Sequence, residues 1–81
     1  MNLNVRLFAT LKERAGALQI SLEVGEPANV SDILAALTEK HPAIKPALQS
    51  ILVSVNQEYA ERTQPIHPGD EIALFPPVSG G

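Results

Sequence analysis

A single amphipathic helix constrains the fold of this chain most strongly. Val30, Ile33, Leu34 and Leu37 recur at the spacing of a helix with one buried face, and His41 continues the stripe. The other apolar patterns alternate with a period of two, which is typical of strands with one buried face. One helix among several strands must bury its apolar stripe against the sheet that they form. The sequence therefore predicts an α+β fold in which the main helix covers one face of a mixed sheet.

The ends of this helix are marked by residues that cap or stop helices. Either Asn29 or Ser31 is placed to accept a hydrogen bond from the first turn. Pro42 ends the helix, because the residue before a proline avoids the α region. A further helical turn is expected after Pro42, with two apolar side chains packed inward, Ile44 and Leu48.

Four stretches alternate polar and apolar residues and are predicted to be strands. Asn56 and Gln57 form a plausible tight turn after the third stretch, and a short edge strand is expected around Tyr59. Pro68 and Gly69 are placed for a type II turn before the last stretch. The side chains expected to face the helix are Leu3, Val5, Leu7, Ala9, Leu18, Ile20, Leu22, Ile51, Val53, Val55, Ile72 and Leu74.

A short helix is expected between the first two strands. The four residues from Thr10 to Glu13 match the capping-box pattern, in which the first and fourth side chains bond each other's backbone N–H. Gly16 supplies a stop. Residues 10–15 should therefore make one or two helical turns that connect the strands.

The order strand, strand, helix, strand, short strand, strand is typical of the β-grasp, or ubiquitin-like, arrangement. In that fold the first and last strands are neighbours in a mixed sheet. The 81 residues make one domain, too small for a large internal cleft. We assign residues 1–75 to the β-grasp domain and residues 76–81 to an extended C-terminal tail.

The predicted tail is narrow, stiff and free of charged side chains. Pro76 and Pro77 lack the N–H that a ladder needs, so the sheet is expected to end at Phe75. Six residues span at most about 20 Å. Gly80 and Gly81 carry no Cβ, so another protein can close around them without a clash.

The functional group expected at the tip is the α-carboxylate of Gly81, which is ionised at neutral pH. A carboxylate is a poor electrophile, so an enzyme that used it would first have to activate it, for example as an acyl adenylate. The alternative is a flexible tail that ends in glycine by chance. The stiff, apolar run before the glycines favours the functional interpretation.

The sequence Phe-Pro-Pro-Val-Ser-Gly-Gly, residues 75–81, resembles the end of the small, sulfur-carrier subunit of molybdopterin synthase. Residues 55–57 and residues 5–9 are similar to the same family, so the resemblance covers nearly the whole chain. Ser79 stands where the family frequently has threonine, and Leu74 stands where it frequently has a second aromatic residue. The specific part of the resemblance is the tail.

The resemblance implies a route for the Gly81 carboxylate. In that family an ATP-dependent activating enzyme adenylates the glycine, and a sulfur donor converts the adenylate to a thiocarboxylate. The tail then inserts into the large subunit and gives its sulfur to cyclic pyranopterin monophosphate. Two carriers supply the dithiolene of molybdopterin, which implies a heterotetramer. The carrier is implied to be a non-catalytic, sulfur-donating subunit that binds no cofactor, since ATP is used by the activating enzyme.

Two further classes of function remain open. Within the carriers, the alternatives are a sulfur carrier for thiamine thiazole synthesis and a ubiquitin-like modifier that is conjugated to proteins. The run from Phe75 to Val78 favours the molybdopterin branch. Outside the carriers, the alternative is a plain β-grasp binding module whose tail has no role.

Composition argues against several other classes. The formal net charge is −3 without a basic cluster, so neither nucleic acid nor an anionic membrane is an expected partner. No signal peptide is indicated, and we expect a cytoplasmic protein. With no cysteine, sulfur would have to be carried on the chain end. His41 and His67 each adjoin a proline and are expected to be solvated, so no metal site is predicted.

An exposed aromatic patch is expected at the root of the tail. If Leu7 and Leu74 face the helix, Phe8 and Phe75 point away from it, and Leu52 can add to them. The alternative is a bulge or twist that turns one aromatic ring into the core. Exposed aromatic patches usually mark contact surfaces. The residues predicted to bind the partner are Phe8, Phe75, Pro76, Pro77, Val78, Ser79 and Gly80, with Gly81 as the reactive residue.

Overall fold

A computed structural model describes residues 1–76 of the chain. Of the predicted tail, only Pro76 falls in this range. Residues 77–81 lie outside the described residues, and with them four of the predicted partner-binding residues and the reactive Gly81. Among the described residues, no helix is long and apolar enough to cross a membrane.

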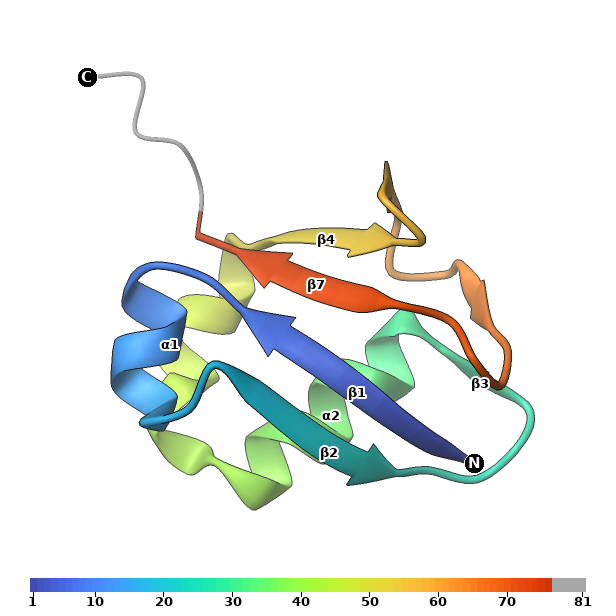
Figure 1. Cartoon of the computed structure of the whole chain (residues 1–81), viewed down its shortest axis with the longest axis horizontal. Helices are drawn as coiled ribbons and strands as arrows, with labels where there is room; N and C mark the ends of the chain where they lie inside the picture. Colours follow the sequence, from blue (N-terminus) through green and yellow to red (C-terminus); the bar gives the residue numbers. More distant parts are fainter. Residues whose placement is uncertain (77–81) are drawn as a thin grey trace.

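Five strands form one mixed sheet in the order β2-β1-β7-β4-β5 (Figure 1). The central pair, β1 and β7, is parallel, whereas β1–β2, β4–β7 and β4–β5 are antiparallel. First and last strands are therefore neighbours, as predicted for a β-grasp fold. The strands are β1 (Asn2–Leu7), β2 (Gln19–Glu23), β4 (Leu52–Val55), β5 (Glu58–Tyr59) and β7 (Ile72–Phe75).

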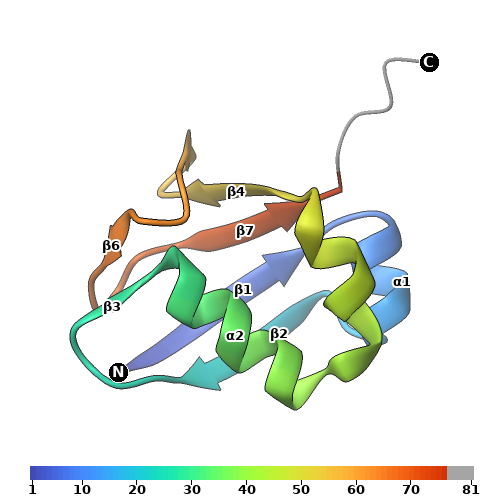
Figure 2. The same cartoon turned by 180° about the vertical axis from the view of Figure 1, so that it is seen from behind.

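The main helix α2 (Val30–Lys40) crosses one face of this sheet (Figure 2). Asn29 is its N-cap: the Asn29 side chain accepts from the Asp32 N–H at 3.0 Å, and the Asp32 carboxylate accepts from the Asn29 N–H at 2.9 Å. The helix ends at Lys40, before His41 and Pro42, as predicted. A 3₁₀ helix, η1 (Pro42–Gln49), follows it and buries Ile44 and Leu48, also as predicted.

The core lies between α2, η1 and the sheet. Alternation correctly identified most of it, because side chains two apart on a strand share a face. The buried residues come from both layers: Leu3, Val5, Leu7, Leu11, Ile20, Leu22, Val30, Ile33, Leu34, Leu37, Ile44, Leu48, Ile51, Val53, Val55, Ile66, Ile72 and Leu74.

Two residues that were expected to face the helix do not. β1 ends at Leu7, and Ala9 adopts a positive φ of 53° and is exposed. Leu18 directly precedes β2, which is an edge strand of the sheet, and Leu18 is 49% exposed. Alternation fails at both positions because each lies just outside its strand.

The capping box expected at Thr10 does not form. The short helix α1 (Thr10–Ala15) has the predicted bounds, but its N-cap is Ala9, and no side chain caps it. Thr10 is already inside the helix, so its side chain is one position too late to cap. Gly16 ends α1 in the left-handed conformation, φ 72°, as predicted. The helix also contributes Leu11 to the core, beyond its expected role as a connector.

A second, two-stranded sheet was not predicted. It pairs β3 (Ala28–Asn29) with β6 (Pro65–Ile66) in antiparallel orientation. Each strand has only two residues, which is too short for an alternating pattern to be recognised.

Both predicted turns are present, and hydrogen bonds join one to the other. Asn56 and Gln57 join β4 to β5 with positive φ values of 53° and 71°, and Gly69 has φ 88° in the turn before β7. The Asp70 carboxylate accepts from the His67 N–H at 2.8 Å and from Asn56 Nδ2 at 3.0 Å. Both bonds lower the pKa of Asp70 below its usual 3.8, and the bond from the His67 backbone has the larger effect.

Replacing Asn29 with alanine should remove the cap of α2 and reduce the free energy of unfolding by about 1 kcal/mol. Urea unfolding of the variant measures this loss. Ser31→Ala is the matched control, because Ser31 was the other candidate cap and its side chain makes no hydrogen bond in the described structure. Equal losses in the two variants would contradict the assignment of the cap to Asn29.

Replacing Asp70 with asparagine should remove a pH-dependent part of the stability. The folded pKa of Asp70 is lowered, so its ionised form stabilises the fold above the unfolded pKa, and this contribution is lost as pH falls through the folded value. The unfolding free energies of wild type and Asp70→Asn should therefore differ most at pH 7 and converge as the pH falls from the unfolded pKa of Asp70 through its lowered folded pKa. A difference that stays constant over this range would disprove the linkage.

Candidate functional site

The candidate site lies on the face of the sheet that the helices leave uncovered. α2 and η1 lie on one side of the sheet, and the opposite face is seen directly in Figure 1. The side chains on the open face alternate with the buried ones along each strand. This face reaches from the edge strand β2 to the hairpin of β4 and β5.

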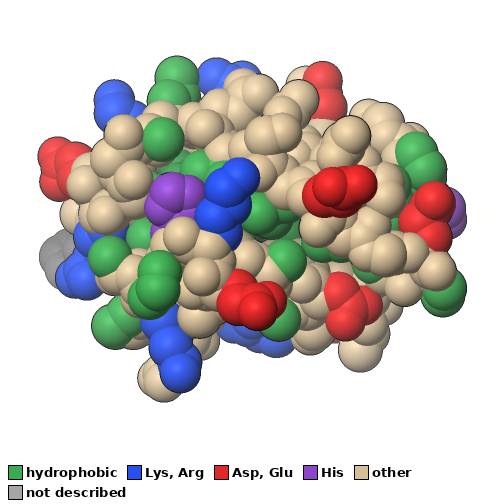
Figure 3. Space-filling view, turned by 90° about the horizontal axis from the view of Figure 1, so that it is seen from below, with side chains coloured by type: hydrophobic (Ala, Val, Ile, Leu, Met, Phe, Trp, Pro, Cys, Tyr) green, Lys and Arg blue, Asp and Glu red, His purple; other side chains and the backbone are tan. Residues whose placement is uncertain are grey.

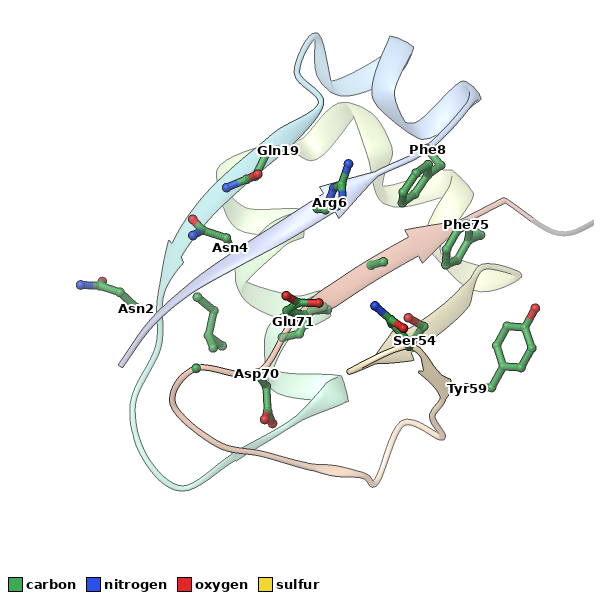
Figure 4. A pocket seen from close by; sticks show the side chains of 15 residues that line it. Asn2, Asn4, Arg6, Phe8, Gln19, Ser54, Tyr59, Asp70, Glu71 and Phe75 are labelled. Carbon is green, nitrogen blue, oxygen red and sulfur yellow. The ribbon is translucent and has the colours of Figure 1, made fainter.

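Phe8 and Phe75 stack on each other at the end of this face where β7 ends (Figure 4). Their ring centroids are 4.7 Å apart and the rings are 10° from parallel. The parallel pairing of β1 with β7 brings them together, since Leu7 is the register partner of Leu74 and the Phe8 N–H donates to the Leu74 carbonyl at 3.3 Å.

Leu52 extends this pair on the other side. It is the register partner of Phe75 across the antiparallel β4–β7 ladder, and its side chain is 37% exposed. Phe8 and Phe75 are half-buried, with neither turned into the core. The predicted arrangement of Phe8, Phe75 and Leu52, here named the aromatic patch, is therefore confirmed, and its role as a partner contact stays a prediction.

The patch is at the root of the tail because β7 ends at Phe75. The next residue, Pro76, is half-buried and outside the strand, as expected for a residue without a backbone N–H. The predicted contacts Pro77, Val78, Ser79 and Gly80 and the reactive Gly81 lie outside the described residues.

Next to the patch the open face is hollowed. The hollow has a volume of about 710 Å³ and is lined by side chains of all five strands and of the turns before β5 and β7. Figure 4 shows Arg6 beside Phe8 and Tyr59 on the opposite side. The hollow is mostly polar away from Phe8 and Phe75, with Asn4, Gln19, Ser54, Asp70 and Glu71 among its lining residues.

Arg6 and Tyr59 were not recognised from the sequence as site residues. The Arg6 guanidinium lies over the Phe8 ring, with its central carbon 5.5 Å from the ring centroid. Tyr59 is 79% exposed and is the register partner of Ser54 on the edge strand. The signal for Arg6 was available, because residues two apart on a strand share a face and Arg6 precedes Phe8 by two.

The described residues form no group of side chains suited to catalysis or to metal binding. No cluster of three or more histidine, cysteine, aspartate or glutamate residues is found within residues 1–76. Asp70 is engaged in its turn, where its carboxylate accepts from the His67 backbone N–H at 2.8 Å, and the imidazole Nδ1 of His67 is 3.9 Å from it. Glu71 is exposed. On the face shown in Figure 3, the basic side chains lie toward the left and most of the acidic ones lie toward the right.

Known proteins with similar sequences match this chain over nearly its whole length. The sequence matches the ThiS family over residues 5–81. It is 35% identical to the molybdopterin synthase sulfur carrier subunit of Chlamydomonas reinhardtii over 83 aligned positions, with all of both chains covered. It is 40% identical to small archaeal modifier protein 1 of Haloferax volcanii, covering 94% of this chain and 97% of that protein.

A solved structure supports the same relationship. The crystal structure of the Haloferax volcanii protein superposes on this chain with a TM-score of 0.90 at 38% identity, with both chains covered completely. The ubiquitin-like β-grasp fold predicted from the element order is thereby confirmed. Since the sequence match extends over nearly the whole chain and the folds agree, this protein belongs to the ThiS family of ubiquitin-like β-grasp proteins.

Proposed function

We propose that this protein is the sulfur carrier subunit of molybdopterin synthase. The observation that carries the proposal is the full-length similarity to a named sulfur carrier, combined with a family match that extends through Gly80 and Gly81. The proposal takes Gly81 as the terminal residue. Its α-carboxylate is the reactive group, and residues 1–75 form the domain that is recognised by partners.

The chemistry begins with activation of the carboxylate. A Gly81 carboxylate oxygen attacks the α-phosphorus of ATP and pyrophosphate leaves, which forms an acyl adenylate. A sulfur donor at the oxidation level of hydrosulfide then attacks the acyl carbon, and AMP leaves with the bridging oxygen. The product is a thiocarboxylate, in which sulfur has replaced one oxygen of Gly81.

The sulfur is then delivered inside a partner. The thiocarboxylate enters the large subunit of molybdopterin synthase and gives its sulfur to cyclic pyranopterin monophosphate. Two carriers supply the two sulfurs of the dithiolene, so the working assembly is a heterotetramer. Delivery within a closed site keeps the thioacid in position and excludes water from the reacting groups.

The described domain supports this division of labour. It offers an aromatic patch and a hollow on its open face, and residues 1–76 hold no cluster of catalytic or metal-binding side chains. We infer that the carrier binds no cofactor and that ATP is bound by the activating enzyme. In this proposal the large subunit, the activating enzyme and the sulfur donor supply the catalysis.

A second candidate is a ubiquitin-like protein modifier. It is favoured by the 40% identity to small archaeal modifier protein 1. Its chemistry shares the acyl adenylate, but a lysine amine of another protein takes the acyl group, so an isopeptide bond replaces the thiocarboxylate. Sulfur transfer for thiamine thiazole synthesis is the remaining carrier alternative, and it differs only in the final acceptor.

Incubation with the cognate activating enzyme, ATP and a sulfur source should raise the intact mass by the difference between sulfur and oxygen. Fragmentation should place this gain on Gly81, because its carboxylate is the proposed acceptor. Deletion of Gly81 or amidation of its carboxylate should abolish both the mass gain and molybdopterin synthesis.

The alternatives give different products in the same experiment. A modifier would form covalent adducts of the whole chain with lysine side chains, and a plain binding module would keep its function after the deletion. Molybdopterin synthesis by an amidated chain would exclude the proposed mechanism.

Replacing Phe75 with serine should weaken binding to the large subunit by about 30-fold, because a central aromatic anchor is lost. The free energy of unfolding should fall by only about 1 kcal/mol, the contribution of an aromatic pair, since the ring is half-buried. Calorimetric titration and urea unfolding measure the two effects.

Leu18→Ser is the matched control for this variant. Leu18 is also a partly exposed apolar residue, but it directly precedes the edge strand β2 and lies outside the aromatic patch. Its replacement should leave binding unchanged. If Phe75→Ser unfolds readily but binds normally, the ring belongs to the core and the assignment of the patch is wrong.

A further inference from the structure

Arg6 is a cation without a carboxylate partner in the described part of the chain. It is exposed at the centre of the open face, and its register partners are Gln19 on β2 and Ala73 on β7. Among residues 1–76, the one ion-pair contact within 4.0 Å joins His67 to Asp70. The Arg6 guanidinium donates no hydrogen bond to a described residue. Its contact is the face of Phe8.

The acidic residues of the same hollow do not neutralise Arg6. Glu71 is two positions before Ala73 on the neighbouring strand, so it stands diagonal to Arg6, and in Figure 4 it lies away from the Phe8 end of the face. Asp70 is held in its turn by His67 and Asn56. The guanidinium is therefore available to a group that approaches the aromatic patch from outside.

We propose that Arg6 determines partner specificity, by pairing with a carboxylate that the partner protein presents beside an apolar recess for Phe8 and Phe75. This inference rests on the proposed function and adds the chemistry by which its partners are recognised. Any protein that takes up the tail must approach its root, where β7 ends at Phe75. Arg6 stands beside that root through its contact with Phe8.

A protein carboxylate fits this position better than the phosphates of a nucleic acid or of a membrane. The chain has a formal net charge of −3, and Asp70 and Glu71 line the same hollow. Extended polyanions need several cations together, and within this hollow Arg6 is the only lysine or arginine among the described lining residues. A single carboxylate needs one guanidinium, which can bind it with two parallel hydrogen bonds.

The contact with Phe8 also holds Arg6 near the position of this pairing, with its guanidinium carbon 5.5 Å from the ring centroid. A cation over an aromatic ring is attracted to it and still has N–H groups that can donate to a carboxylate. When the partner closes over Phe8 and Phe75, water is excluded and the charge pair becomes stronger than it would be on an open surface. The aromatic patch thus supplies binding area, and Arg6 selects among proteins with apolar recesses.

Three variants of Arg6 test this inference against the adenylating enzyme of the proposed reaction. Arg6→Leu should weaken binding about tenfold and flatten its dependence on salt concentration, because the charge pair is lost. Arg6→Glu should weaken binding further, since two carboxylates would face each other. Arg6→Lys should give an intermediate affinity, because it keeps the charge but not the planar contact with Phe8.

The matched control is Lys45→Leu, which removes the same charge from η1 on the helical side of the domain. It should bind like wild type at every salt concentration. Each variant is also checked by thermal unfolding and by the mass gain on Gly81 at saturating enzyme, which should be retained by Arg6→Leu because the tail is intact.

The possible failures are distinguishable. If Arg6→Leu and Arg6→Glu bind within twofold of wild type, Arg6 has no part in recognition and the inference is overturned while the carrier function stands. If Lys45→Leu weakens binding as much as Arg6→Leu does, the effect is one of net charge, and the inference is also overturned. If the wild-type chain neither binds the enzyme nor gains mass, the proposed function fails and the inference fails with it.

Discussion

The parallel pairing of β1 with β7 is the interaction on which the rest of this structure depends. It joins the first and last strands at the centre of the sheet, with Val5 opposite Ile72 and Leu7 opposite Leu74. All four of these side chains are buried in the core that α2 covers. Because side chains alternate along both strands, the same ladder that buries the leucines places Phe8 beside Phe75 on the opposite face. The packing of the core and the arrangement of the aromatic patch are therefore fixed by one register.

This register also fixes where the aromatic patch lies along the sheet. β7 supplies a central strand and ends at Phe75, so the patch stands at the point where the sheet gives way to Pro76. A shift of β7 by one residue would turn Phe75 inward and Leu74 outward, and the patch and the core would be lost together. The burial of Ile72 and Leu74 therefore fixes the register of β7, and with it the position of Phe75 in the patch.

The sequence predicted the parts of the fold in which burial and backbone chemistry agree. Strand alternation located Leu3, Val5 and Leu7, and the glycine and proline turn before β7 formed as expected. Errors arose where a local pattern was decided by the geometry of the neighbouring chain. Thr10 has the right neighbours for a capping box, but Ala9, with a positive φ, is the N-cap of α1, so Thr10 lies inside the helix and does not cap it. The small sheet of β3 and β6 rests on a long-range pairing that short strands do not reveal. Strand alternation could have placed Arg6 on the same face as Phe8, but its contact with the Phe8 ring and its lack of a carboxylate partner within residues 1–76 are visible only in the structure.

Similar proteins carry names of two kinds, sulfur carrier and protein modifier. In the proposed function and its modifier alternative, the two reactions share an acyl adenylate and diverge only in the nucleophile that attacks it, which belongs to another molecule. The tip of the tail, with two glycines, has no side chain that could prefer sulfur over an amine. Discrimination must therefore act earlier, in the choice of the protein that receives the activated chain. The open face of the described domain is a surface that such a protein can contact, because α2 and η1 lie on the opposite face of the sheet. In the proposed function the outward-facing residues of β1, β7 and β4 therefore act together with the residues after Phe75 in the choice of that protein.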